Sequence, residues 1–137
     1  MACDVDRHSY MSFYNIFDKN LLEKERTRSF VLLNIGDALK NHEIEVYYQP
    51  QVDARTGKLC GAEGLARWNS PKAGFMMPGK FIPVLEAANF TYKLDIYIIR
   101  QIARDFRKCI EEGTPIVPVS FNFSRTDFET CNPYEEL

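Results

Sequence analysis

The sequence lacks the features that mark several protein classes. Its four cysteines, Cys3, Cys60, Cys109 and Cys131, are scattered and form no CxxC pair. This pattern argues against a zinc knuckle and against a disulfide framework, and it indicates reduced thiols. The sequence also has no apolar run long enough to cross a bilayer and no signal-peptide core at its N-terminus. We therefore expect a cytoplasmic segment, and a membrane anchor outside this sequence would be compatible with that expectation.

The sequence has no excess of charge of either sign. It contains 17 basic and 19 acidic residues, which give a formal net charge of −2. No basic footprint predicts binding to a nucleic acid polymer or to an anionic membrane. The 137 residues are 45% hydrophobic and 26% charged, which is typical of one globular domain with a core of its own.

Hydrophobic periodicity and turn residues predict helices that alternate with strands. Asp18 fits the N-cap of an amphipathic helix over residues 19–41. Asp53 and Gly57 fit a short hairpin loop, so the strands on either side of it should pair antiparallel. The expected elements are a helix over 19–41, strands over 45–52 and 58–68, a loop over 69–79, helices over 80–88 and 92–112, and a strand over 116–123.

Strand alternation groups chemically interesting side chains on one face of each expected strand. It places Glu63, Leu65 and Arg67 on one face of the second strand. On the first strand Gln49 shares a face with Tyr47 and Gln51, and on the last strand Asn122 shares a face with Ser120. Glu and Arg are rarely buried unless they pair or bind a ligand. Two interpretations therefore stay open for Glu63 and Arg67, namely a solvated edge with a salt bridge between them and a ligand site. For Asn122 the alternative is a strand-end residue that caps the next turn, and for Gln49 it is an ordinary polar strand residue.

Five short motifs occur in order between residues 38 and 128: YYQP, GAEGLARW, a proline-glycine loop with FIP, LDxxxIRQ, and SFNFS. Together they resemble the N-terminal half of the EAL domain, the cyclic di-GMP phosphodiesterase family of bacterial signalling. Residues 1–37 are similar to the end of a GGDEF domain and its linker helix. The resemblance implies a division into residues 1–18, the tail of a preceding GGDEF-like domain; 19–41, a linker helix; and 42–137, the N-terminal part of an EAL domain.

The resemblance implies an α/β fold, a partial TIM-like (β/α) barrel with an antiparallel first strand. A complete barrel typically needs about 250 residues, so we expect one that is truncated after about three strands. The implied reaction is hydrolysis of cyclic di-GMP to linear pGpG with Mg²⁺ or Mn²⁺, which prefer oxygen ligands. By motif, Glu63 and Asn122 match metal ligands. Gln49, Leu65 and Arg67 match substrate-binding positions, and Arg67 suits a phosphate oxygen.

The sequence departs from the family pattern in two places. Gly64 stands where the signature has alanine, but it should point away from the ligand, so we expect a loss of strand rigidity and an intact metal position. The family's further acidic ligands and its catalytic lysine lie downstream of the NxS motif, and no position of this chain matches them. We therefore expect the isolated segment to be inactive.

Three functions follow as hypotheses. The first is the N-terminal portion of a cyclic di-GMP phosphodiesterase. The alternative is a non-catalytic, degenerate EAL module that binds cyclic di-GMP or a protein partner. The third is a structural segment whose exposed sheet edges drive association. The expected partners are cyclic di-GMP, a second copy through the EAL domain, and an upstream GGDEF or sensor domain of a longer protein.

Overall fold

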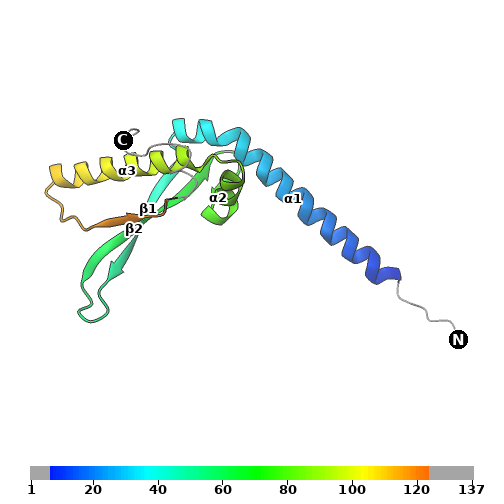
Figure 1. The fold of residues 1–137 in the computed structure, drawn as a ribbon, viewed down its shortest axis with the longest axis horizontal. Coiled ribbons are helices and arrows are strands. Elements are labelled where there is room, and N and C mark those ends of the chain that lie inside the picture. The colour runs from blue at the N-terminus through cyan, green and yellow to red at the C-terminus, as the bar shows by residue number, and fades with distance from the viewer. Residues whose placement is uncertain (1–6, 124–137) are drawn as a thin grey trace.

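The computed structural model describes residues 7–123, with side chains from Asp18 onward. Four strands form one sheet, and three helices pack against it or extend from it (Figure 1). In chain order the elements are α1 (Arg7–Lys40), β1 (Ile44–Val52), β2 (Leu59–Ser70), β3 (Gly74–Met76), α2 (Pro78–Ala87), α3 (Thr91–Glu111) and β4 (Val119–Phe121). The two hairpin strands and the helices α2 and α3 are confirmed to within two residues at each end, whereas β4 is shorter than the strand predicted over 116–123.

The N-terminal boundary predicted for the first helix is wrong. α1 begins at Arg7, so Asp18 lies inside the helix and is not its N-cap. The segment from residue 7 to residue 18 contains no glycine or proline. Because extending a helix is much easier than nucleating one, nothing in this segment stops α1 from continuing upstream.

The loop predicted over residues 69–79 contains a strand that the sequence interpretation missed. β3 pairs antiparallel with the end of β2, with Trp68 opposite Met76 and Ser70 opposite Gly74. The Ser70 hydroxyl accepts hydrogen bonds from the amides of Lys72 and Ala73, both at 3.3 Å. Proline and glycine were taken as signs of an irregular loop, but here they make a tight turn between two paired strands.

The sheet is built on the predicted hairpin. β1 and β2 pair antiparallel from Ile44 opposite Trp68 to Val52 opposite Leu59. In the connecting loop the Asp53 carboxylate accepts hydrogen bonds from the amides of Arg55 and Thr56, at 2.8 and 3.1 Å. β4 joins the other side of β2 in parallel, through residues 62–64. Among the described strands β1 lies at an edge, as expected for a strand that contains a proline.

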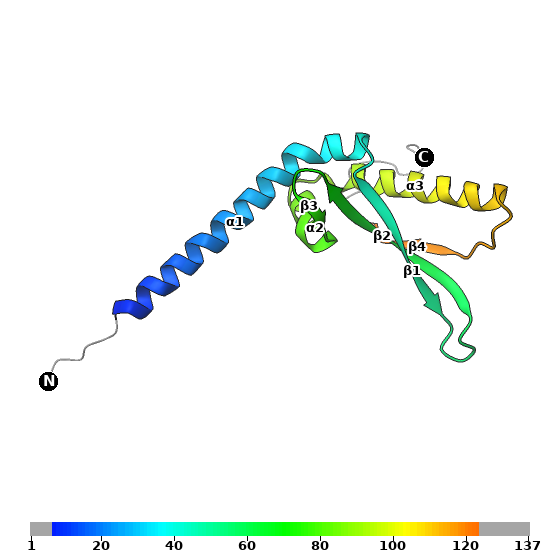
Figure 2. The same cartoon turned by 180° about the vertical axis from the view of Figure 1, so that it is seen from behind.

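The helices cover one face of the sheet, and the core lies between them and that face (Figures 1 and 2). Trp68 of β2 is fully buried and packs edge-on against Phe81 of α2, with ring centroids 5.7 Å apart. Its indole Nε1 donates to the Glu43 carboxylate at 3.0 Å, so its one polar group is satisfied. Burying such a side chain stabilises the fold by roughly 1.5–3 kcal/mol. Trp68 therefore holds β2 against the helices.

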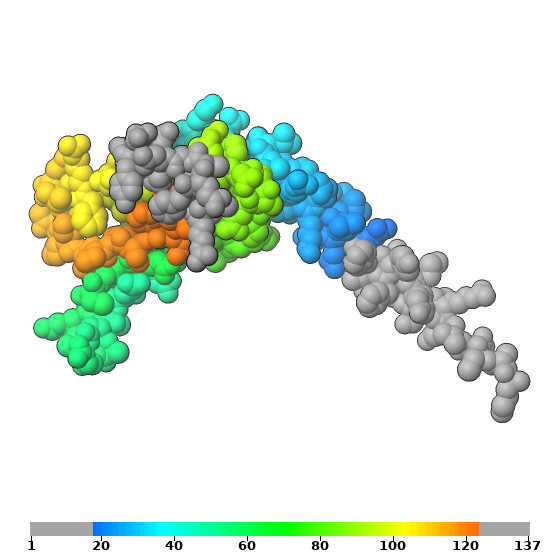
Figure 3. Space-filling model, in the orientation of Figure 1, coloured from blue at the N-terminus to red at the C-terminus, as the bar shows by residue number. Residues whose placement is uncertain are grey.

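Only the C-terminal part of α1 belongs to this core. Val31, Ile35 and Ala38 are buried, whereas Leu21 and Leu22 are more than half exposed. The rest of the helix extends away from the body (Figure 1), as does the hairpin loop at the opposite end (Figure 3). None of the helices in the described part of the chain is both long and apolar enough to cross a membrane.

Gly64 faces the core and not the site, as the strand alternation predicts. A Cβ atom added there would lie 3.0 Å from Cδ1 of Ile102 in α3 and 3.4 Å from Cγ1 of Val46. The tighter of these contacts is with the far end of a flexible side chain. The alanine that the family signature carries at this position is therefore opposed here mainly by Ile102.

This packing makes the effect of Gly64→Ala depend on residue 102. In the wild-type background the crowding should outweigh the lower chain entropy of alanine and destabilise the fold by about 1 kcal/mol. In an Ile102→Val background, which lacks Cδ1, the same change should stabilise the fold by about 0.5–1 kcal/mol. Urea unfolding of the four variants measures both effects. Equal effects in the two backgrounds would refute the packing argument.

Candidate functional site

The predicted site residues lie on the sheet face that the helices leave uncovered. Because successive side chains of a strand point to opposite faces, the contact between Gly64 and Ile102 places Glu63 and Leu65 on the other side of β2. We call this uncovered surface the site face. It is formed by Tyr47, Gln49, Glu63, Leu65, Arg67, Ser120 and Asn122.

Three strands bring the predicted metal ligands and one predicted substrate-binding residue together. Glu63 lies directly opposite Gln49 of β1 and opposite Ser120 of β4. Asn122 follows β4 directly, and its Nδ2 donates a hydrogen bond to Oε1 of Glu63 at 3.0 Å. The two side chains are 59 residues apart in the sequence, so the parallel pairing of β4 with β2 creates their contact.

Arg67 lies farther along β2 and makes different contacts. Its Nη1 donates to the carbonyl oxygen of Ala66 at 2.8 Å, and its Cζ lies 5.7 Å from the centre of the Tyr47 ring. The ion pairs found within the described range do not include Arg67 or Glu63. The salt bridge considered as an alternative for these two residues is therefore absent.

Leu65 connects the two parts of the site face. It is half-buried and lies opposite Tyr47 in the β1–β2 register. The ring of Tyr47 in turn lies 6.2 Å from that of Phe75 in β3, measured between centroids. Sequence reasoning placed Tyr47 on the same face as Gln49 but assigned it no role. It missed Phe75 because β3 was taken for a loop.

Glu63 and Asn122 fit a hard divalent cation in donor type. A carboxylate and an amide supply the oxygen ligands that Mg²⁺ and Mn²⁺ prefer. In the present arrangement Asn122 turns its nitrogen toward Glu63, so rotation of the amide would be needed to offer its oxygen on the same side. Within residues 7–123, as far as they are described, no cluster of three or more His, Cys, Asp or Glu side chains could hold a metal. The pair is thus a partial ligand set.

Tyr48, on the opposite face of β1, attaches this strand to α3. Its hydroxyl donates to Oδ2 of Asp105 at 2.5 Å. Burial, followed by this hydrogen bond and the charge of Asp105, raises the pKa of Tyr48 well above its usual value. The hydroxyl therefore stays protonated and keeps donating throughout the physiological range, which fixes the strand that carries Tyr47 and Gln49.

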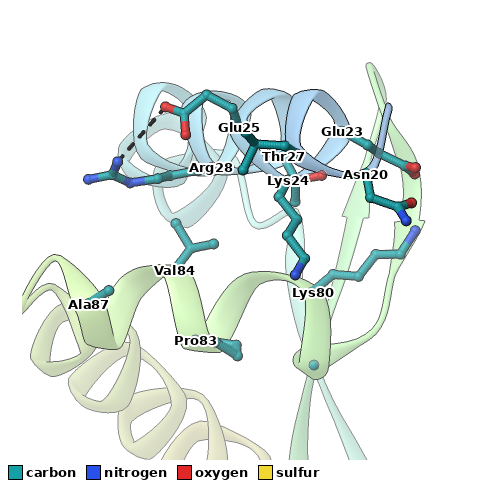
Figure 4. A pocket seen from close by; sticks show the side chains of 12 residues that line it. Asn20, Glu23, Lys24, Glu25, Thr27, Arg28, Lys80, Pro83, Val84 and Ala87 are labelled. Atoms are coloured by element: carbon teal, nitrogen blue, oxygen red, sulfur yellow. Dashed lines mark ion pairs between the residues drawn. The ribbon is translucent and has the colours of Figure 1, made fainter. Parts of the chain in front are cut away.

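The main cavities lie away from the site face. One, of about 650 Å³, opens between α1 and α2, and Lys24 and Lys80 extend into it from opposite sides (Figure 4). Two smaller ones, of about 400 and 170 Å³, lie between α3 and the core side of β1 and β2. None of the five predicted site residues lines these three cavities, which is expected for a site on an open sheet surface.

Comparison with known proteins identifies relatives of this chain. A family model described as "EAL domain" matches residues 33–134. Cyclic di-GMP phosphodiesterase RocR of Pseudomonas aeruginosa is 44% identical over 78 residues, which cover 57% of this chain and 20% of that protein. The bifunctional diguanylate cyclase/cyclic di-GMP phosphodiesterase MucR of the same species is 27% identical over 127 residues, which cover 93% of this chain and 18% of that protein.

Solved structures that resemble this chain also contain EAL domains. The structure titled "PaMucR Phosphodiesterase, c-di-GMP complex" is 25% identical to this chain and superposes with a TM-score of 0.68, covering 77% of this chain and 43% of that one. The FimX EAL domain of Xanthomonas citri, at 16% identity, shares the fold with a TM-score of 0.69, covering 84% of this chain and 44% of that one. These likenesses confirm the expected partial TIM-like barrel. The chain spans between 16% and 20% of the length of the curated relatives it matches.

The separation of Glu63 from Arg67 predicts that the two side chains are energetically independent. Exposed ion pairs typically contribute about 0.2–1 kcal/mol, so a salt bridge would appear as a coupling of that size in a double-mutant cycle. We expect the cycle of Glu63→Gln and Arg67→Ala, measured by urea unfolding, to give a coupling below about 0.2 kcal/mol. A larger favourable coupling would show that the two side chains pair in solution.

Proposed function

This chain belongs to the EAL domain family, and we propose that it forms the N-terminal portion of a cyclic di-GMP phosphodiesterase in bacterial second-messenger signalling. The proposed reaction is hydrolysis of cyclic di-GMP to linear pGpG. The single observation that carries the proposal is the contact of Asn122 with Glu63, 3.0 Å long, on the same face as Gln49 and Arg67. Residues from three strands thus converge where the family motifs predict a ligand site.

Each of the five site residues has a role in this proposal. Glu63 and Asn122 would hold a divalent metal ion through one carboxylate and one amide oxygen. Such an ion, Mg²⁺ or Mn²⁺, supplies activation of water and stabilisation of charge on the phosphodiester. Gln49 would donate and accept hydrogen bonds with the nucleotide, and Leu65 would pack against its guanine. Arg67 would bind a phosphate oxygen, for which its planar guanidinium is suited.

Hydrolysis would need more ligands than the described residues supply. Mg²⁺ demands near-octahedral coordination, and Glu63 with Asn122 offers two side chains. We therefore propose that the segment binds ligand weakly and does not turn it over without further acidic residues. EAL phosphodiesterases generally depend on divalent metals, which supports this proposal for a chain of their family.

The proposed neighbours are an upstream domain and a second copy of the chain. MucR is named as bifunctional, and one matching structure is titled "Vibrio cholerae LapD S helix-GGDEF-EAL". We propose that residues 1–18 end a preceding GGDEF-like or sensor domain and that residues 19–41 link it to the EAL part from residue 42. α1 runs without a break across residue 18, so such a linker would be one rigid helix.

A second candidate function is binding without hydrolysis. Three of the five site residues, Gln49, Leu65 and Arg67, match substrate-binding positions, and Arg67 makes no ion pair that would compete with a phosphate in the described structure. The site face thus supplies the proposed substrate-binding contacts more completely than the proposed metal ligands. This favours a degenerate EAL module that recognises cyclic di-GMP or a protein partner.

Turnover by the full-length protein tests the enzymatic proposal. We expect hydrolysis of cyclic di-GMP that needs Mg²⁺ or Mn²⁺ and that falls more than about 100-fold in Glu63→Ala, because the loss of even outer-shell partners of a metal costs 10–100-fold. Glu86→Ala, an exposed glutamate of α2, is the matched control and should keep wild-type turnover. Unchanged turnover in Glu63→Ala would remove Glu63 from the metal site.

Calorimetry separates the two candidate functions. If the full-length protein binds cyclic di-GMP and shows no turnover with either metal, the non-catalytic module is the correct assignment. If it neither binds nor hydrolyses cyclic di-GMP, both nucleotide-dependent functions fail, and a protein-binding or structural role is left.

A further inference from the structure

The guanidinium of Arg67 is held by two contacts, and no carboxylate in the described structure pairs with it. Its Nη1 donates to the Ala66 carbonyl oxygen at 2.8 Å, and its Cζ lies over the Tyr47 ring, 5.7 Å from the ring centre. The ring distance is within the range of a cation–π interaction, about 6 Å. Glu45 lies directly opposite Arg67 in the strand register and still makes no ion pair with it. Four of the five guanidinium N–H groups are left without a described partner.

The Ala66 carbonyl explains the first contact. The backbone N–H of Asn69 donates to the backbone carbonyl of Glu43 at 2.8 Å, so Asn69 faces β1. In an antiparallel pair only every second residue directs its backbone groups to the partner strand. Ala66 is one of the residues in between, so its carbonyl points away from β1. Ala62, which has the same parity, accordingly donates its amide to Pro118 on that side, at 2.9 Å.

On the side of β2 away from β1, none of the described strands pairs with Ala66. β4 pairs with residues 62–64 and β3 with residues 68–70, so neither strand reaches the Ala66 carbonyl. An unpaired strand carbonyl costs free energy unless another donor satisfies it. The Arg67 side chain folds back to supply that donor. This contact fixes one end of the guanidinium against the sheet.

Tyr47 and Phe75 explain the second contact. Tyr47 lies opposite Leu65, so it is the diagonal neighbour of Arg67, a spacing that long and aromatic side chains can span. Phe75 packs against it from β3, with ring centroids 6.2 Å apart. The residues Tyr47 and Phe75 are 48% and 51% exposed. Because they are not part of the core, they are available to orient a neighbour on the site face.

We propose that Tyr47 is the positioning residue of Arg67. Its ring, packed against Phe75, holds the guanidinium on the site face with its remaining N–H groups directed to an incoming phosphate oxygen. A side chain ordered before binding loses less entropy when the ligand arrives, so affinity rises without a new contact to the ligand. The inference rests on the proposed function, since it takes the phosphodiester of cyclic di-GMP as the anion that Arg67 meets.

Binding of cyclic di-GMP to Tyr47 variants tests the proposal. Tyr47→Leu should weaken affinity about threefold to tenfold, and Tyr47→Phe, which keeps the ring, should stay within about twofold of wild type. In an Arg67→Ala background, Tyr47→Leu should cause no further loss. The matched control is Tyr92→Leu in α3, a tyrosine that lies beside Lys93 and outside the site face, which should bind like wild type once circular dichroism has shown it to be folded.

Two binding results would overturn the positioning role. One is wild-type affinity in Tyr47→Leu. The other is an equal loss with Tyr47→Leu whether or not Arg67 is present, because Tyr47 would then act on the ligand directly or through the fold.

A second measurement needs no ligand. The ring current of Tyr47 should shift the side-chain N–H resonance of Arg67 in the NMR spectrum, and Tyr47→Phe should keep this shift while Tyr47→Leu abolishes it. A resonance unmoved by Tyr47→Leu overturns the positioning role. If the resonance moves but the wild-type chain binds no cyclic di-GMP, the contact is established and it is the proposed function that fails.

Discussion

The antiparallel pairing of β1 with β2 is the constraint on which the rest of the structure depends. Its register sends Trp68 into the core, where it is fully buried and bonded to Glu43, and sends Glu63 and Arg67 to the uncovered face. A slip of one residue would reverse both assignments along the whole strand. The core therefore selects the register, and the register builds the site face. The packing of the core and the arrangement of the site face therefore cannot be varied independently.

The second constraint is the pairing of β4 with β2, two strands that are far apart in the sequence. Asn122 reaches Glu63 only because β4 returns in parallel beside β2, with Ser120 level with Glu63. The return depends on α3, whose buried Leu94, Ile98 and Ile102 pack on the core side of the sheet. The packing of α3 on the core face thus positions Asn122 beside Glu63 on the site face.

How far the sequence could predict this structure depends on the range of the interactions involved. Asp53 and Gly57 with alternating strands were enough for the hairpin, and periodic apolar residues were enough for α3. Pro71 and Gly74 concealed β3, because the same residues serve tight turns and irregular loops. Parity placed Arg67 on the correct face but could not decide between Glu63 and Tyr47 as its neighbour, since that depends on side-chain distances. The roles of the five site residues came from motif resemblance, and they remain predictions.

We propose that one face of the sheet, and not a cavity, receives cyclic di-GMP. The most direct measurement is an NMR titration of the isotope-labelled chain with cyclic di-GMP and Mg²⁺ that follows side-chain signals. We expect shifts in the Leu65 methyls and in the side-chain amides of Gln49 and Asn122, with the Ala66 methyl on the core face unmoved. Shifts confined to residues of the cavity between α1 and α2, or a moved Ala66 methyl with an unmoved Leu65, would contradict the account.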